Sequence, residues 1–177
     1  MNDRAILKNI KKPVSGTELK DMLNDTVDVV LYKDLIMYDS IDELFKKNDS
    51  IALLYEFKPN YGHWVGLIHQ PQYNRIEFFC SYGIPVDGHK KYIPSNYIDV
   101  SGQRPNYLSS LLSKSSKEIH YNEIQMQMRS NMISTCGRHI AVRILWKHIP
   151  LEKYQSIMLM NGKHGSDYLV TYITTYI

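Results

Sequence analysis

Three apolar segments that follow one another closely in the chain set the strongest limit on its fold. They cover residues 51–57, 63–69 and 75–82, and they are rich in the β-branched and aromatic side chains that favour β-strands. The intervening residues 58–62 and 70–74 contain proline, glycine and asparagine, which are typical of turns. Strands joined by such short turns pair in antiparallel fashion. The sequence therefore predicts three adjacent antiparallel strands at the centre of the fold.

Helices and one further strand are predicted around this centre from capping residues and from hydrophobic periodicity. The predicted elements are helices at 18–23 after Ser15, at 41–45 after Ser40, at 108–112, at 135–148, at 151–159 and at 166–176, a surface loop over 83–106, and a fourth strand over 117–128. This order indicates an α+β fold with a small mixed or antiparallel sheet of about four to five strands flanked by helices. The length suits a single domain over residues 1–177.

The charge and the cysteine content exclude several classes of protein. The net charge of +3 comes from 21 basic and 18 acidic residues, which permits a weak association with DNA without indicating one. Cys80 and Cys136 form neither a disulfide framework nor a zinc-finger pattern, which favours a reducing compartment. The chain lacks an apolar run long enough to span a membrane, and its first residues lack the apolar core of a signal peptide. We therefore expect an intracellular protein without a membrane partner.

Cys136 lies at the predicted start of a helix, in the sequence Ser-Thr-Cys-Gly-Arg. A helix N-terminus and a nearby imidazole both favour the reactive thiolate form of a cysteine. Gly137 would leave room for a substrate carbonyl to reach the N–H groups of the first turn, which stabilise an oxyanion. Most free cysteines are simply buried apolar residues, so this position needs a partner before it indicates chemistry. His63, which opens the second predicted strand and precedes Trp64, is the candidate base, and we expect Trp64 to pack over it.

The order of these residues distinguishes between families of cysteine peptidases. Here the histidine precedes the cysteine, which is opposite to the papain order, and the cysteine motif differs from that of the caspases. Residues 51–146 resemble the adenovirus-type and ubiquitin-like-protein-type cysteine peptidases, in which His-Trp is followed by an acid, a glutamine and Cys-Gly. Within that clan the chain is most similar to the maturation proteases of virophages, Polinton elements and large DNA viruses.

The resemblance implies a catalytic set of His63, Cys136 and a glutamine that stabilises the oxyanion, without a cofactor or a metal. We prefer Gln127 as this glutamine because it lies closer to Cys136, and Gln125 remains the alternative. Cys80 occupies the position of the family's acid. Either Cys80 leaves a His–Cys pair without an acid, or Glu77, Asn74 or Asp87 supplies the third residue.

The resemblance implies that the protein cleaves viral capsid or other virion precursor proteins. It would act in the virion and in the viral factory of the host-cell cytoplasm. Three alternatives remain open. The same catalytic residues would serve a peptidase that removes ubiquitin-like tags such as SUMO. A non-enzymatic module could bind zinc through His63, Cys80, Cys136 and either His69 or His139. A nucleic-acid-binding or capsid-binding protein without catalysis would use the basic and tyrosine side chains.

Overall fold

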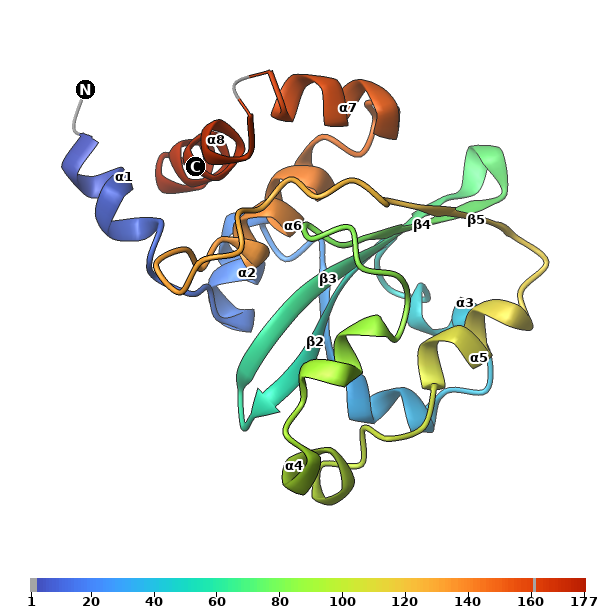
Figure 1. Cartoon of the computed structure of the whole chain (residues 1–177). Helices are drawn as coiled ribbons and strands as arrows, with labels where there is room; N and C mark the ends of the chain where they lie inside the picture. Colours follow the sequence, from blue (N-terminus) through green and yellow to red (C-terminus); the bar gives the residue numbers. More distant parts are fainter. Residues whose placement is uncertain (1–2, 161) are drawn as a thin grey trace.

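The structure, a computed structural model, describes residues 3–160 and 162–177. Its helices are α1 Asp3–Asn9, α2 Gly16–Met22, α3 Ile41–Leu44, α4 Ser95–Val100, α5 Tyr107–Ser113, α6 Cys136–Leu145, α7 Leu151–Met158 and α8 Gly162–Thr175. Its strands are β1 Asp28–Leu31, β2 Ser50–Lys58, β3 Tyr61–Gln70, β4 Arg75–Phe79 and β5 Glu118–Tyr121. Short 3₁₀ turns lie at η1 Tyr32–Met37, η2 Pro71–Tyr73 and η3 Gly88–Tyr92. The described residues thus form an α+β fold (Figure 1).

The strands form one mixed sheet in the order β1-β2-β3-β4-β5. The predicted antiparallel arrangement of β2, β3 and β4 is confirmed. The two edge strands pair in parallel, β1 with β2 and β5 with β4. Parallel pairing requires a crossover, and both crossovers contain helical segments: η1 and α3 precede β2, while α4 and α5 precede β5.

Helices cover both faces of the sheet because its central strands are apolar on both sides. In β2, Ile51, Leu53 and Tyr55 face the layer of η1, α3 and α5, whereas Ala52 and Leu54 face the layer of α2, α6, α7 and α8. Figure 1 shows these two groups of helices on opposite sides of the strands. A strand buried on both faces reads as a near-continuous apolar run, as residues 51–55 do.

Helix α6 is the central helix of its layer. Its residues from Gly137 to Ile144 are all buried, between the sheet on one side and α2 and α8 on the other. The buried charge of Arg143 is paired with Glu77 of β4, whose carboxylate lies 2.7 Å from the guanidinium. The helix that begins at Cys136 is therefore fixed to the sheet by packing and by an ion pair.

The predicted fourth strand over 117–128 is wrong beyond Tyr121. Asn122 turns the chain there, because its side-chain amide donates to the carbonyls of Cys80 and Ile124 and accepts the N–H of Ile124. Asparagine favours such local turns over a continued ladder. Met126 and Gln127 then both donate their backbone N–H groups to the carbonyl of Ser81. The segment after β5 therefore folds over the end of β4 and does not extend the strand.

Three other predicted boundaries also need correction. The predicted strand 75–82 ends at Phe79, and Gly83 makes the turn that follows, with a φ of 65° and no room for a side chain. The segment 83–106 is not simply a loop, since it contains η3 and α4. The last helix begins at Gly162 and not at Ser166, which places Ser166 and Asp167 inside it as buried residues. The predicted cap of α2 is confirmed as a capping box between Ser15 and Glu18.

Within residues 3–160 and 162–177, no helix combines the length and the apolar character that crossing a membrane requires.

Candidate active site

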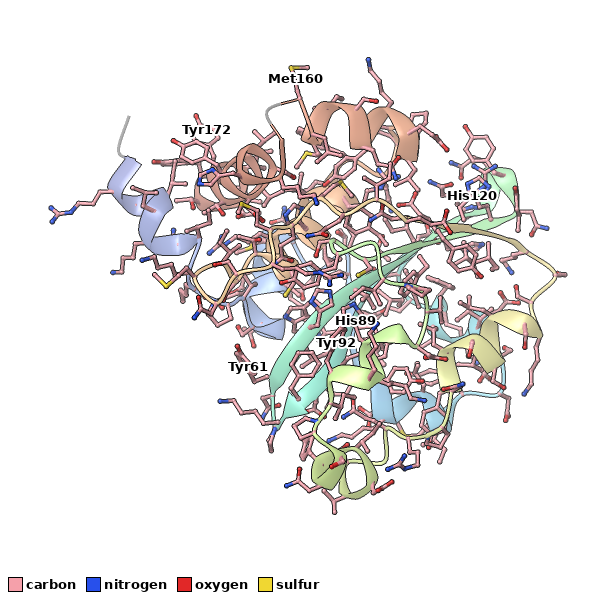
Figure 2. All side chains as sticks on the ribbon, in the orientation of Figure 1. Tyr61, His89, Tyr92, His120, Met160 and Tyr172 are labelled. Carbon is pink, nitrogen blue, oxygen red and sulfur yellow. The ribbon has the colours of Figure 1, made fainter. Side chains whose placement is uncertain are left out.

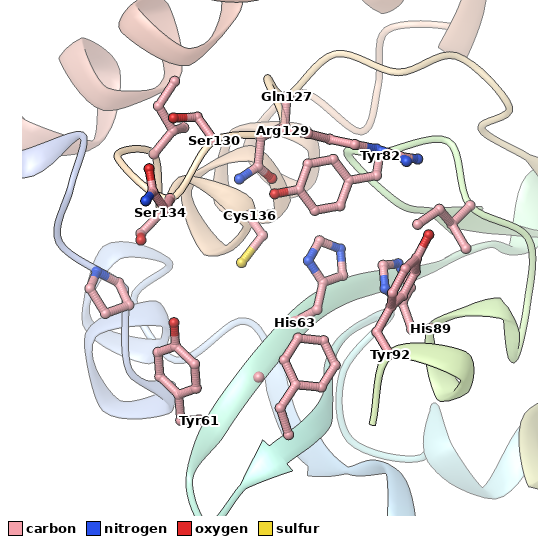
Figure 3. Close-up of a pocket in the computed structure, with 16 residues that line it drawn as sticks. Tyr61, His63, Tyr82, His89, Tyr92, Gln127, Arg129, Ser130, Ser134 and Cys136 are labelled. Atoms are coloured by element: carbon pink, nitrogen blue, oxygen red, sulfur yellow. The ribbon is translucent and has the colours of Figure 1, made fainter. Parts of the chain in front are cut away.

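A cavity of about 460 Å³ brings together the three residues predicted to act in catalysis. His63, Gln127 and Cys136 all line it, together with Tyr82, His89 and others. Tyr61, at the start of β3, and His89 and Tyr92, in η3, also line it and are labelled in Figure 2. The close-up in Figure 3 shows the Cys136 sulfur and the His63 ring facing the same space. Segments that are far apart in the sequence therefore contribute to one site.

Cys136 is the first residue of α6, as the sequence predicted, and its side chain is partly buried. Burial raises the pKa of the thiol, while nearby backbone N–H groups of Trp64, Gly137 and Cys136 itself act in the opposite direction. The net direction is upward, so the helix N-terminus does not by itself produce a resting thiolate. Deprotonation of Cys136 at neutral pH therefore requires a base beside it.

Gly137 has a different role from the one expected. A Cβ atom at this position would lie 3.0 Å from Cβ of Val14 and 3.2 Å from Cδ1 of Trp64, so it would point into the core. The glycine thus allows the first turn of α6 to approach these residues closely. Trp64 faces this core and not His63, and its indole nitrogen donates to the carbonyl of Val14 at 2.9 Å. The expectation that Trp64 packs over His63 is wrong because adjacent strand residues point to opposite faces.

His63 lies on β3 with its ring almost fully buried. The ring contacts Tyr82, with a centroid distance of 4.9 Å, and His89, with a centroid distance of 4.0 Å. Burial lowers the pKa of the imidazole well below its ordinary value, and the neighbouring His89 and His139 lower it further. The imidazole is therefore neutral at neutral pH, with one ring nitrogen that carries no proton.

Cys80 contacts the Nε2 atom of the His63 imidazole. Its sulfur lies 3.6 Å from Nε2 of His63 and 3.1 Å from Nε2 of His89. The three acid or amide candidates are engaged elsewhere. Glu77 pairs with Arg143, and Asp87 accepts from Tyr32, Tyr55 and Ser109. Asn74 lies in the turn after η2 with a φ of 48°.

His89 is the residue that the sequence reasoning missed. It lies in η3, and its buried ring lines the cavity beside His63. The sequence shows it only as part of the basic triplet His89-Lys90-Lys91 in a segment predicted to be a loop. Its approach to His63 depends on the crossover between β4 and β5, which no local pattern reveals.

Gln127 is held in one orientation by Ser81. The Ser81 hydroxyl donates to the Gln127 side-chain oxygen at 2.7 Å, and the Gln127 backbone N–H donates to the Ser81 carbonyl at 3.0 Å. With its oxygen occupied in this way, the amide presents its NH₂ group to the cavity, beside Cys136 (Figure 3). The alternative, Gln125, donates its amide to the carbonyl of Gln127 at 2.8 Å. Gln125 therefore supports the position of Gln127.

A buried carboxylate on α8 connects the segments that carry Gln127 and Cys136. Asp167 accepts the Thr135 hydroxyl at 2.5 Å and the backbone N–H of Met128 at 2.9 Å, and it contacts Nε2 of His139 at 3.0 Å. Thr135 directly precedes Cys136, and Met128 directly follows Gln127. One carboxylate therefore fixes the positions of Cys136 and Gln127 relative to each other. The sequence predicted only that a helix starts at Ser166 and did not suggest this role for Asp167.

The chain has a relative among known proteins. No family model matches it. A protein of Sputnik virophage described as uncharacterized protein V9 is 41% identical over 167 residues, which cover 93% of this chain and 95% of that protein. Identity at this level over nearly the full length of both chains indicates a shared fold and a common origin. The comparison supplies no activity.

Proposed function

Since the chain belongs to the same family as protein V9 of Sputnik virophage, we propose that it is a cysteine endopeptidase that cleaves viral capsid or other virion precursor proteins. Cys136 is the proposed nucleophile, His63 the proposed base and Gln127 the proposed oxyanion donor. The relationship to a virophage protein supports a viral origin, and the choice of virion precursors as substrates follows from the resemblance of residues 51–146 to viral maturation proteases. Its place of action would be the virion and the viral factory in the host-cell cytoplasm.

The orientation of Gln127 is the observation that carries this proposal. A cysteine and a histidine meet by chance in many proteins, but a buried amide whose oxygen is fixed and whose NH₂ group faces a cavity beside a helix-initial thiol is a specific arrangement. Donors fixed in advance toward a developing oxyanion are often the largest single contribution to catalysis. The same cavity holds the neutral imidazole that the protonated thiol requires.

The proposed reaction begins with a neutral thiol and a neutral imidazole. The Nε2 atom of His63 faces Cys80, so Nδ1 is the atom on the side of Cys136 (Figure 3). Nδ1 accepts the thiol proton as the Cys136 sulfur attacks the peptide carbonyl, and Gln127 with the Cys136 backbone N–H binds the oxyanion. The proton passes to the leaving amine, and water then hydrolyses the thioester. Each step uses only groups that line the cavity.

The competing zinc module of the sequence analysis does not assemble as predicted. Among the described residues, the side chains close enough to share a metal are His63, Cys80 and His89. His69 instead pairs with Asp49, and His139 pairs with Asp167. No contact among the described residues favours tag removal or nucleic-acid binding over cleavage of virion precursors.

Cleavage of the candidate substrates tests the proposal directly. We expect the purified protein to cut one or more capsid precursors of its own virus at defined sites, identified by mass spectrometry of the new termini. The matched control is Cys136→Ala, which should leave the precursors intact. If wild type and variant give the same termini, or if no precursor is cut, the proposal is wrong.

The two glutamines give a second prediction with an internal control. We expect Gln127→Ala to lower kcat by roughly 10²- to 10³-fold with little change in KM, which is the effect of removing one oxyanion donor. Gln125→Ala should have a much smaller effect, because its amide only supports the Gln127 carbonyl. Kinetics on one fluorogenic peptide derived from the mapped cleavage site would measure both. An equal loss in the two variants would exclude Gln127 as the specific donor.

A further inference from the structure

We propose that His63, Cys80 and His89 form a binding site for Zn²⁺ at the floor of the cavity, and that zinc bound there blocks the peptidase reversibly. The regulatory part rests on the proposed function, whereas the metal site rests on geometry alone. One possible ligand atom from each of the three residues, a ring nitrogen of each histidine and the Cys80 sulfur, lies within 4.8 Å of the other two.

The spacing of the three atoms is close to what zinc requires. Zinc bonds of about 2.3 Å to sulfur and about 2.0–2.1 Å to nitrogen in a tetrahedron place the sulfur and each nitrogen about 3.6 Å apart. The observed sulfur–nitrogen distances are 3.6 Å for His63 and 3.1 Å for His89. The two imidazole rings are stacked, with planes 18° apart, so their Nε2 lone pairs run side by side and do not meet at one point. Rotation of at least one imidazole about its side-chain torsions would bring both Nε2 atoms onto one ion.

The chemistry of these groups also favours a metal. A thiol has a single proton to share with two imidazoles, and hydrogen bonds to sulfur are weak. Among the described residues no carboxylate contacts this group, although buried imidazoles usually find a stronger partner. A thiolate with two imidazoles is instead a ligand set that suits zinc well and magnesium or calcium poorly.

The cavity provides the remaining coordination position. His63 and His89 line the cavity, whereas the fully buried Cys80 lies behind them. Three protein ligands with one side open to solvent would leave a place for a water molecule. Cys136, which is not part of this group of ligands, would remain a free thiol.

Zinc at this position would stop the proposed reaction through His63. A neutral imidazole that binds a metal through Nε2 carries its proton on Nδ1. Because Nδ1 is the atom on the side of Cys136, it could no longer accept the thiol proton. Cys80 and His89 would thus be neighbours of the base when no metal is present, and with His63 they would inhibit the enzyme when metal is bound.

Metal binding is tested without any assay of activity. We expect chelator-treated protein to bind one Zn²⁺ in competition with a chromophoric chelator, and to show thiolate-to-metal absorption when Co²⁺ is used instead. Substitution of residues that only support metal ligands typically lowers the metal affinity by roughly 10- to 100-fold. Cys80→Ser and His89→Gln remove ligands, so each should lower the affinity for zinc by more than this. Cys136→Ala and His69→Gln should bind zinc as wild type does. Absent binding in wild type, or loss of binding in Cys136→Ala, would overturn the site.

Inhibition is tested separately. We expect Zn²⁺ to stop peptide cleavage by wild type, and a chelator to restore it, while His89→Gln keeps its own zinc-free rate at the same zinc concentration. If zinc binds but does not slow wild type, the regulatory part fails and the metal site stands. If the protein cleaves no peptide at all, the proposed function fails, and the binding titrations still decide the metal site.

Discussion

Replacing His63 by glutamine is expected to slow peptide cleavage by roughly 10²- to 10⁴-fold, the usual contribution of a general base. Replacing Cys136 by alanine should abolish cleavage and sets the baseline for this comparison. Glutamine approximates the size of the histidine and can occupy its place beside Tyr82 and His89, so the fold should be retained. The losses are measured as kcat/KM on a peptide from the mapped cleavage site, with chelator-treated protein.

The pH dependence of the same variants identifies what His63 does. The imidazole is active when neutral, and burial lowers its pKa well below 6.5, so the acid limb of wild-type activity should lie well below pH 6.5. The Cys136 pKa is raised above 9.0, so wild type should show a plateau between these limits. In the His63→Gln variant no base removes the thiol proton, so attack depends on the fraction of Cys136 that has ionised to the thiolate at the pH of the solution. The rate of peptide cleavage by this variant should therefore keep rising up to pH 9 and beyond.

Two results would contradict this assignment. A wild-type acid limb near pH 6.5 or above would mean that the imidazole is not the buried neutral base described here. A His63→Gln variant with the same plateau as wild type would mean that another group accepts the proton. Alkylation of Cys136 by iodoacetamide, followed by peptide mapping to separate it from Cys80, would give the same pH profiles independently of any substrate.

The parts of this fold that the sequence predicted depend on neighbours along the chain. Strands β2, β3 and β4 are joined by short turns, so their apolar runs and turn residues define both the elements and their pairing. The start of α6 at Cys136 follows from the apolar run after Gly137 in the same way. The edge strand β1 was missed because four residues form it and its partner β2 is reached only after η1 and α3.

The parts of the site that the sequence did not predict depend on residues brought together by the crossovers. His89 reaches His63 only because the segment between β4 and β5 folds back over the sheet. Gln127 was preferred over Gln125 for its proximity to Cys136, and the structure places it at the cavity for another reason, its two bonds with Ser81. Asp167 connects these segments from the last helix, where no spacing rule could assign it a partner.

The buried ion pair between Glu77 and Arg143 should give the largest effect on stability. Glu77→Gln is expected to lower the free energy of unfolding by roughly 3–5 kcal/mol, because it leaves the guanidinium buried without a counter-charge. The pair is bidentate, both side chains are at most 2% exposed, and Arg143 also donates to the Trp146 carbonyl. For a chain of this size the melting temperature should fall by roughly 6–20 °C, measured by calorimetry or circular dichroism.

Glu118 on β5 provides a matched control for this prediction. Its carboxylate pairs with Arg75 of β4 through two guanidinium nitrogens, but Glu118 is 58% exposed. Glu118→Gln should therefore cost no more than about 1 kcal/mol, as exposed ion pairs do. If Glu77→Gln lowers the free energy of unfolding no more than Glu118→Gln does, burial does not increase the effect of losing the Glu77–Arg143 pair on stability.

The double variant Glu77→Met/Arg143→Met separates the cost of an unpaired charge from the contribution of the pair itself. Apolar side chains of similar volume often replace a buried ion pair with little loss of stability, so the double variant should be more stable than Glu77→Gln. Its activity is the more informative measurement, because Arg143 lies on the helix that begins at Cys136. If the pair also sets the position of α6 against β4, the double variant should recover stability while keeping a reduced kcat.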